Sequence, residues 1–117
     1  MLAFKKKYLL IIENIKYFEL KNIKKGEKFI IIYRNTKNNE KIKELINFRN
    51  QCRLKRIKFF IANNTSLAIK LKADGIYLSA HNHNLKALFF RKKFDLIGSA
   101  HNYKEIDLKK KQGCKYI

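Results

Sequence analysis

Apolar residues gather in short runs, between which they recur every three or four positions. Four runs are continuous enough for strands that are buried on both faces of a parallel sheet, at 29–33, 57–62, 75–78 and 96–99. The segment 114–117 has the pattern of a further strand at its start. The intervening segments show the spacing of amphipathic helices, over 39–53, 64–71, 84–92 and 102–113.

Polar residues at the starts of these helices fit the same reading. Asn38 or Asn39 is placed to cap the first helix, and Asn64 or Thr65 the second. Asn102, with a Glu three residues later, has the spacing of a capping box, and Gly113 fits the end of that helix. Strands that alternate with helices predict βαβ units and therefore an α/β fold with a parallel sheet.

The first part of the chain shows a helical stripe of its own. Within 4–22, apolar residues recur at intervals of three and four, namely Phe4, Tyr8, Ile11, Ile12, Ile15 and Phe18. This spacing predicts an amphipathic helix that packs on the domain. The predicted organisation is thus an N-terminal helix and turn, residues 1–28, followed by an α/β domain, residues 29–117.

The charge of the chain suggests a polyanionic partner, but the composition weakens that suggestion. Lys and Arg number 28 against 9 Asp and Glu, which gives a net charge of +19. Val, Pro and Trp are absent, while Lys, Ile, Asn and Phe, which share A/T-rich codons, are abundant. Codon bias can supply surface lysines, and sites that read phosphates bidentately favour Arg. We therefore disfavour nucleic acid as the partner and keep a basic module binding nucleic acid or protein as the alternative.

Several classes of protein lack their sequence signatures here. No apolar run approaches the roughly 20 residues of a membrane-spanning helix, and we expect a cytoplasmic protein without a membrane partner. Cys52 and Cys114 form no CxxC and are expected to fill apolar space. The phosphate-binding loop of NTPases, the dinucleotide fingerprint and the hydrolase nucleophile elbow do not occur.

Polar side chains follow each predicted strand. They are Arg34, Thr36 and Lys37, then Asn63 and Asn64, then residues 79–82, and then residues 99–102. Because parallel strands end at one edge of a sheet, these groups should share that edge, where α/β proteins bind ligands. A cation with hydroxyls, amides and helix N-termini suits a phosphorylated ligand. Taken singly, each Asn, Ser or Thr also fits a helix cap.

A short repeat places histidines at the same edge. Ser-Ala-His-Asn occurs at 79–82 and again at 99–102, so two successive units are expected to use the same loop chemistry. Few potential metal ligands lie near His81, His83 and His101 in the sequence, which disfavours a metal site. His101 is the better candidate for proton transfer, because histidine changes charge near neutral pH.

The chain contains, in this order, Tyr33-Arg34, Asn63-Asn64-x-x-Leu67-Ala68, Ala73-Asp74-Gly75-Ile76-Tyr77-Leu78, Ile97-Gly98-Ser99-Ala100-His101-Asn102 and Gly113-Cys114-Lys115-Tyr116-Ile117. From about residue 29 onward, this order and spacing resemble the thiamine-phosphate synthase/TenI family. The resemblance implies a partial (β/α)8 TIM barrel, with about four βα units and the start of a fifth strand. It also implies a place in thiamine biosynthesis.

The resemblance implies an activity as well. Synthases of the family are transferases that join a hydroxymethylpyrimidine diphosphate to a thiazole phosphate, releasing pyrophosphate with Mg²⁺. The TenI branch includes thiazole tautomerases, and tautomerase activity is the second activity that the resemblance implies. The implied ligand is a phosphorylated thiazole or pyrimidine.

The family's site residues carry over in part. Arg34 matches the arginine of a Gln-x-Arg-x-Lys strand end, with Lys37 one residue beyond the family's lysine, and Ser99 and His101 match its Ser-x-His loop. Two further positions, Asn63 and Asn82, occupy the places of the magnesium aspartates. Asn offers only neutral carbonyl oxygens, so Mg²⁺ is expected if synthase activity is retained, and otherwise no cofactor. A metal-free tautomerase or phosphate binder would need only Arg34, the helix N-termini and His101.

The length of 117 residues is short for such a fold, because a full barrel takes about 200 residues or more. A half-barrel has unpaired strand edges and an uncovered apolar face. Three expectations follow: a fragment or truncated gene, self-association that completes the sheet, or a degenerate remnant.

Overall fold

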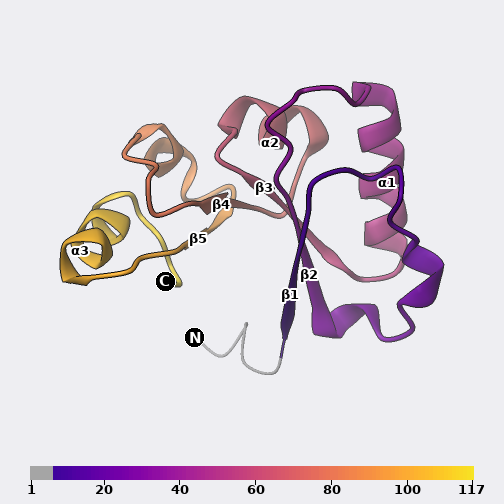
Figure 1. Cartoon of the computed structure of the whole chain (residues 1–117), viewed down its shortest axis with the longest axis horizontal. Helices are drawn as coiled ribbons and strands as arrows, with labels where there is room; N and C mark the ends of the chain where they lie inside the picture. Colours follow the sequence, from indigo (N-terminus) through magenta and orange to yellow (C-terminus); the bar gives the residue numbers. More distant parts are fainter. Residues whose placement is uncertain (1–6) are drawn as a thin grey trace.

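The computed structural model describes residues 7–117, which form one sheet of five parallel strands with helices around its outside (Figure 1). The strands are β1 Tyr8–Ile12, β2 Phe29–Tyr33, β3 Lys58–Ala62, β4 Gly75–Leu78 and β5 Asp95–Gly98. The α-helices are α1 Ile42–Leu54, α2 Thr65–Leu71 and α3 Tyr103–Lys111. Short 3₁₀ helices are η2 Leu20–Asn22, η3 Gly26–Lys28 and η4 Lys86–Phe90.

The strands lie side by side in their chain order, β1-β2-β3-β4-β5. Right-handed crossovers between neighbours in such an order place every connection on the same face of the sheet. This is the arrangement of a barrel wall, whereas a doubly wound sheet reverses its order partway. The structure thus confirms the predicted α/β fold with a parallel sheet.

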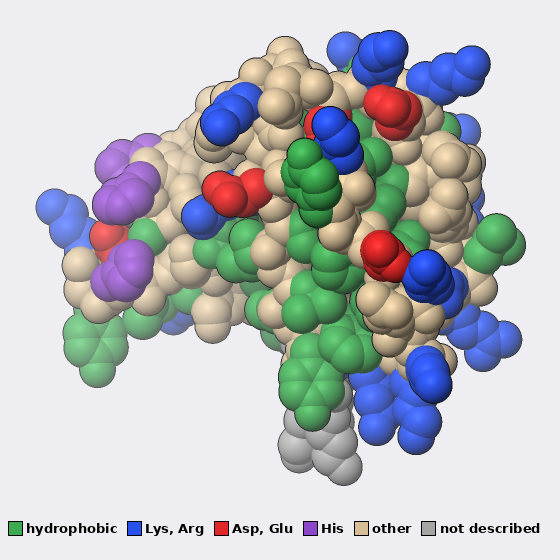
Figure 2. All heavy atoms as spheres, turned by 45° about the vertical axis from the view of Figure 1, so that its right-hand side comes forward, with side chains coloured by type: hydrophobic (Ala, Val, Ile, Leu, Met, Phe, Trp, Pro, Cys, Tyr) green, Lys and Arg blue, Asp and Glu red, His purple; other side chains and the backbone are tan. Residues whose placement is uncertain are grey.

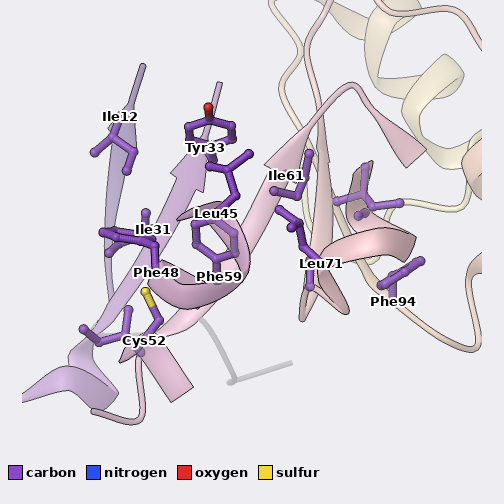
Figure 3. Close-up of a cluster of buried hydrophobic side chains, with 14 of the residues drawn as sticks. Ile12, Ile31, Tyr33, Leu45, Phe48, Cys52, Phe59, Ile61, Leu71 and Phe94 are labelled. Carbon is purple, nitrogen blue, oxygen red and sulfur yellow. The ribbon is translucent and has the colours of Figure 1, made fainter. Parts of the chain in front are cut away.

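Both faces of the sheet carry buried apolar residues, and the cluster on the face covered by helices is the larger one. On the helix side, buried residues of the strands such as Ile31, Phe59 and Ile61 pack with Leu45 and Phe48 of α1 (Figure 3). The concave side has a smaller cluster, formed by Ile30, Ile32, Phe60, Ala62 and Ile97. Burial on both faces explains why the strands read as continuous apolar runs.

The N-terminal helix predicted over 4–22 is wrong. Residues 4–6 lie outside the described part, and residues 8–12 form β1, which pairs with β2 from Tyr8 opposite Phe29 to Ile12 opposite Tyr33. The segment after β1 contains only the 3₁₀ turns η2 and η3. Five consecutive apolar residues fit a strand as well as a helix, and pairing with β2 decides between them because it packs Leu10 and Ile12 into the core.

This correction changes the organisation of the whole chain. Since β1 belongs to the sheet, the segment from Tyr8 to Lys28 is part of the domain, and the sheet has a strand beside β2 that was not predicted. The last predicted strand, 114–117, makes a single parallel bridge between Ile97 and Tyr116.

Two helices differ from their predictions, one in its N-terminal cap and one in its type. Helix α1 is preceded by Lys41, not by a capping Asn38 or Asn39. The amide of Asn35 bonds the backbone N–H groups of residues 37 and 38 and the side chain of Asn39, so these asparagines build a turn instead. The helix predicted over 84–92 is the shorter 3₁₀ helix η4.

The other two caps are confirmed. The side chain of Asn64 accepts from the N–H of Leu67 at 2.9 Å, and that of Asn102 accepts from the N–H of Glu105 at 2.9 Å. The Glu105 carboxylate accepts from the N–H of His101, one residue before the cap, where a capping box would use the N–H of Asn102. Gly113, with φ of +90°, follows α3 in a conformation that few other residues adopt.

The cysteines are free and lie in or against the core, as expected of space-filling residues. Burial raises the pKa of the Cys52 thiol to about 12 and that of Cys114 to about 11. Within residues 7–117, no helix is both long and apolar enough to cross a membrane.

Candidate functional site

The carboxyl ends of the strands meet at one edge of the sheet, as predicted, since all four strand pairings are parallel. The residues that follow the strands therefore line that edge. They are divided among separate hollows: Arg34 and Lys37 in one, Asn63 and Asn82 in a second, and Ser99 in a third on the concave side.

The second of these hollows, called here the amide cavity, lies over the ends of β3 and β4 and has a volume of about 240 Å³. It is lined by Asn63, Asn64, Thr65, Ser66, Leu78, Asn82, Asn84, Lys86 and Ala87. The Asn63 Oδ1 accepts from the backbone N–H of Ser79 at 3.0 Å and from the Asn82 Nδ2 at 2.8 Å. Asn63 has a φ of +57°, a conformation that asparagine tolerates better than most residues.

Two fully buried polar side chains of the α3 segment hold the loop behind this cavity. The Lys109 Nζ donates to the Asn82 carbonyl at 2.9 Å and to the Gln112 Oε1 at 2.8 Å. The Gln112 Nε2 donates to the carbonyls of Asn82 and Asn84 at 2.8 and 2.9 Å. Burial lowers the pKa of the Lys109 ammonium. These two residues fix the loop that carries Asn82.

Gly98, at the end of β5, makes room for that lysine. A Cβ at this position would lie 2.5 Å from the Lys109 Cδ and 2.8 Å from the Cys114 Sγ. Sequence reasoning missed Lys109 and Gln112, because a lysine within the basic run 109–111 reads as a solvated helix end.

The burial of Lys109 also bears on the alternative of a basic binding module. Lys109 is completely shielded from solvent, so the run 109–111 does not present three adjacent lysines at the surface. Its cations lie in the last turn of α3, where they interact favourably with the helix dipole.

The hollow at the end of β2 is lined by the two cations that the sequence predicted for the site. Arg34 and Lys37 line it with Glu13 and Asn14, and its volume is about 110 Å³. A neighbouring hollow of about 300 Å³ shares Thr36 with it and shares Asn64 with the amide cavity. Polar hollows therefore follow one another along the edge from β2 to β4.

Glu40, which the sequence did not single out, closes one side of this edge. Its carboxylate accepts from the N–H of Ile15 at 3.0 Å and from the Tyr33 hydroxyl at 2.6 Å. Burial, followed by the bond to Glu40, raises the pKa of Tyr33. The carboxylate thereby ties the loop after β1 to the end of β2.

Ser99 lies on the concave side. Its Oγ accepts from the Tyr77 hydroxyl at 3.0 Å, and both residues line a hollow of about 540 Å³. The rest of that hollow is mainly apolar and includes Leu9 and Ile11, which are 49% and 50% exposed.

His101 lies at the surface, where Figure 2 shows the histidines gathered near an acidic side chain. Its Nδ1 is 3.2 Å from the Glu105 Oε1, which also accepts from the His101 backbone N–H at 2.6 Å. That backbone bond is the main reason why the pKa of Glu105 is lowered. His101 does not line the amide cavity. The repeated loops also differ, since Asn102 caps a helix and Asn82 bonds Asn63.

The residues at the magnesium positions do not fit Mg²⁺. The Asn63 Oδ1 already accepts two hydrogen bonds, and the Asn82 Oδ1 accepts from the N–H of Asn84 at 2.8 Å. Mg²⁺ needs accessible oxygen ligands and favours carboxylates, whereas none of the described residues that line the amide cavity is acidic. Among residues 7–117, no group of three His, Cys, Asp or Glu side chains could hold a metal ion.

Comparisons with known proteins agree with the sequence resemblance. A family model described as thiamine monophosphate synthase matches residues 13–117. No curated protein matches the chain. Among solved structures, a thiamine phosphate pyrophosphorylase from Pyrococcus furiosus matches with a TM-score of 0.70 and 20% identity, over 97% of this chain and 59% of that one. The chain thus spans about three fifths of that protein, and the likeness confirms the partial barrel.

Proposed function

Because the chain belongs to the thiamine monophosphate synthase/TenI family, we propose that it binds a phosphorylated thiazole or pyrimidine at the carboxyl edge of its sheet. The observation that carries this proposal is the network of Asn63, Ser79 and Asn82 over the ends of β3 and β4. It holds polar groups at the edge where barrel enzymes bind their ligands.

The polar groups of the edge suit the two parts of such a ligand. A phosphate group presents only acceptor oxygens at neutral pH, and the Arg34 guanidinium offers a planar fork of donors to it. Lys37 and the Ser66 hydroxyl are further donors, in the same hollow as Arg34 and in the amide cavity respectively. The Ser99 and Tyr77 hydroxyls beside the apolar concave hollow suit the heterocyclic ring.

We propose a transferase reaction of the synthase type as the first candidate activity. A tautomerase reaction is the second, and the contact between His101 and Glu105 favours it. Tautomerisation moves a proton, which a histidine oriented by a carboxylate can accept and return without a metal ion.

Calorimetric titration with thiazole phosphate tests the binding proposal. We expect saturable one-site binding by the unaltered chain. Loss of one charge-assisted hydrogen bond costs about 1.5–3 kcal/mol, so Arg34→Ala should weaken binding by tenfold or more. Asn63→Gly should weaken it as well, while its backbone retains the positive φ.

Arg53→Ala is the matched control, since Arg53 is exposed in the last turn of α1 and lines none of these hollows. The control should bind like the unaltered chain. Failure of the unaltered chain to bind either thiazole phosphate or a pyrimidine phosphate would refute the proposal.

A further inference from the structure

Some polar groups of the amide cavity are hydrogen-bonded within the protein, and others remain available to a ligand. The Asn63 Oδ1 faces a backbone donor, the N–H of Ser79, which fixes the orientation of that amide. The Asn82 amide is engaged on both sides, by Asn63 and by the N–H of Asn84. The acceptor oxygens are therefore consumed within the protein, and the Asn63 Nδ2 is the part of the pair left to donate.

The charges around the cavity have one sign. Lys86 is the one ionisable residue among the described residues that line it. A second positive charge, the Lys109 ammonium, lies one hydrogen bond behind the cavity wall at the Asn82 carbonyl. No carboxylate lies within ion-pair distance of Lys109 among residues 7–117. Its ammonium is bonded to two uncharged oxygens, and the Glu105 carboxylate acts on it only from beyond ion-pair distance.

Donors and positive charge attract an anion and repel a divalent cation, and the interaction is strong where water is partly excluded. We propose that the amide cavity binds a phosphate group directly, with Lys86 and Lys109 supplying the charge that a divalent cation would otherwise bring. This inference rests on the proposed function and names the chemistry of the same site. The Asn63 Nδ2, the Ser66 hydroxyl and the Lys86 ammonium are the donors to the phosphate oxygens.

Titration with inorganic phosphate tests this inference, once in EDTA and once with excess Mg²⁺. We expect the same affinity under both conditions. Lys86→Gln should weaken binding by fivefold or more, whereas Lys92→Gln, an exposed lysine outside the cavity, should leave it unchanged. Binding only in the presence of Mg²⁺, or no binding under either condition, would overturn the inference.

A metal titration adds a readout that does not depend on the anion. The free Mn²⁺ signal in electron paramagnetic resonance should not fall in the presence of the unaltered chain. The Asn63→Asp/Asn82→Asp variant places two carboxylates at the cavity and should bind one Mn²⁺. Stoichiometric binding by the unaltered chain that Asn63→Gly abolishes would contradict the inference.

The two proposals fail in different ways. Thiazole phosphate that binds only with Mg²⁺ would refute metal-free binding and leave the proposed function intact. Inorganic phosphate that binds in EDTA, when thiazole phosphate and a pyrimidine phosphate do not bind under any condition, would refute the proposed function and leave the anion site.

Discussion

The two ends of β3 and β4 use polar side chains in opposite ways. At the amino end, the Asp74 carboxylate accepts from the N–H of Phe59 at 2.8 Å and lies 4.0 Å from the Arg49 guanidinium. Arg49 is only 3% exposed and donates to the carbonyls of Leu71 and Lys72. At the carboxyl end, Asn63 and Asn82 bond each other at the wall of a cavity.

This difference separates the structural end of the sheet from the candidate site. At the amino end, the charged groups face protein partners, so that end has little left to offer a ligand. At the carboxyl end, the uncharged amides of Asn63 and Asn82 bond each other, and the Asn63 Nδ2 is the donor that we propose for a ligand. The same division is general in barrels, whose active sites lie at the carboxyl ends of the strands.

At the amino end, removal of the buried Arg49 guanidinium should have the largest effect on the stability of the fold. Arg49→Met leaves Asp74 without its cation and two carbonyls without a donor, and we expect the free energy of unfolding to fall by about 3 kcal/mol. Urea denaturation followed by circular dichroism measures this loss. The affinity of the folded variant for thiazole phosphate should not change. A loss below about 1 kcal/mol, or one matched by the exposed control Arg53→Met, would remove the contrast between the two ends.

At the carboxyl end, loss of the cap of α2 should have a smaller effect. Asn64 lines the amide cavity, but its Oδ1 is used by the N–H of Leu67. Asn64→Ala should therefore lower the free energy of unfolding by about 1 kcal/mol, and Asn64→Asp should restore it. Thermal denaturation checks both variants. A larger effect on ligand affinity than that of Asn63→Gly would show that the assignment of these two asparagines is reversed.

The smallest effect on stability is expected at the half-buried carboxylate of Glu105, at the same edge. Because the N–H of His101 lowers the pKa of Glu105 in the folded state, this carboxylate stabilises the fold at pH values above the pKa of an ordinary glutamate. That stabilisation should disappear as the pH falls through the lowered pKa. Acid titration of the unaltered chain and Glu105→Gln should therefore give curves that converge at low pH, and parallel curves would contradict this role.

The sequence predicted the centre of the fold well because local and long-range signals agree there. The apolar run at 75–78 and the capped helix after Asn64 appear as predicted. The segment 8–12 was misassigned because its apolar spacing also fits a helix, and only the pairing with Phe29–Tyr33 selects the strand. That partner is distant in sequence, so no local pattern shows it.

The candidate site was predicted by its position but not by its connections. The residues after the strands do share one edge, and Asn63 and Asn82 do come together. The supporting pair, Lys109 and Gln112, was missed. The local sequence is a basic run, and it shows neither the burial of these two side chains nor their bonds to the 82–84 loop. The burial of Arg49, which is 3% exposed, was not predicted either.

The most direct test of the account is to map the bound ligand residue by residue. In a nitrogen-edited nuclear magnetic resonance titration with thiazole phosphate in EDTA, we expect saturable shifts at the backbone amides of Asn63, Ser79 and Asn82, and of Arg34 along the same edge. The amides around Arg49 and Asp74 should not shift. Shifts at that amino end, or non-saturating shifts spread over the lysine-rich surface, would contradict a ligand site at the carboxyl edge of the sheet.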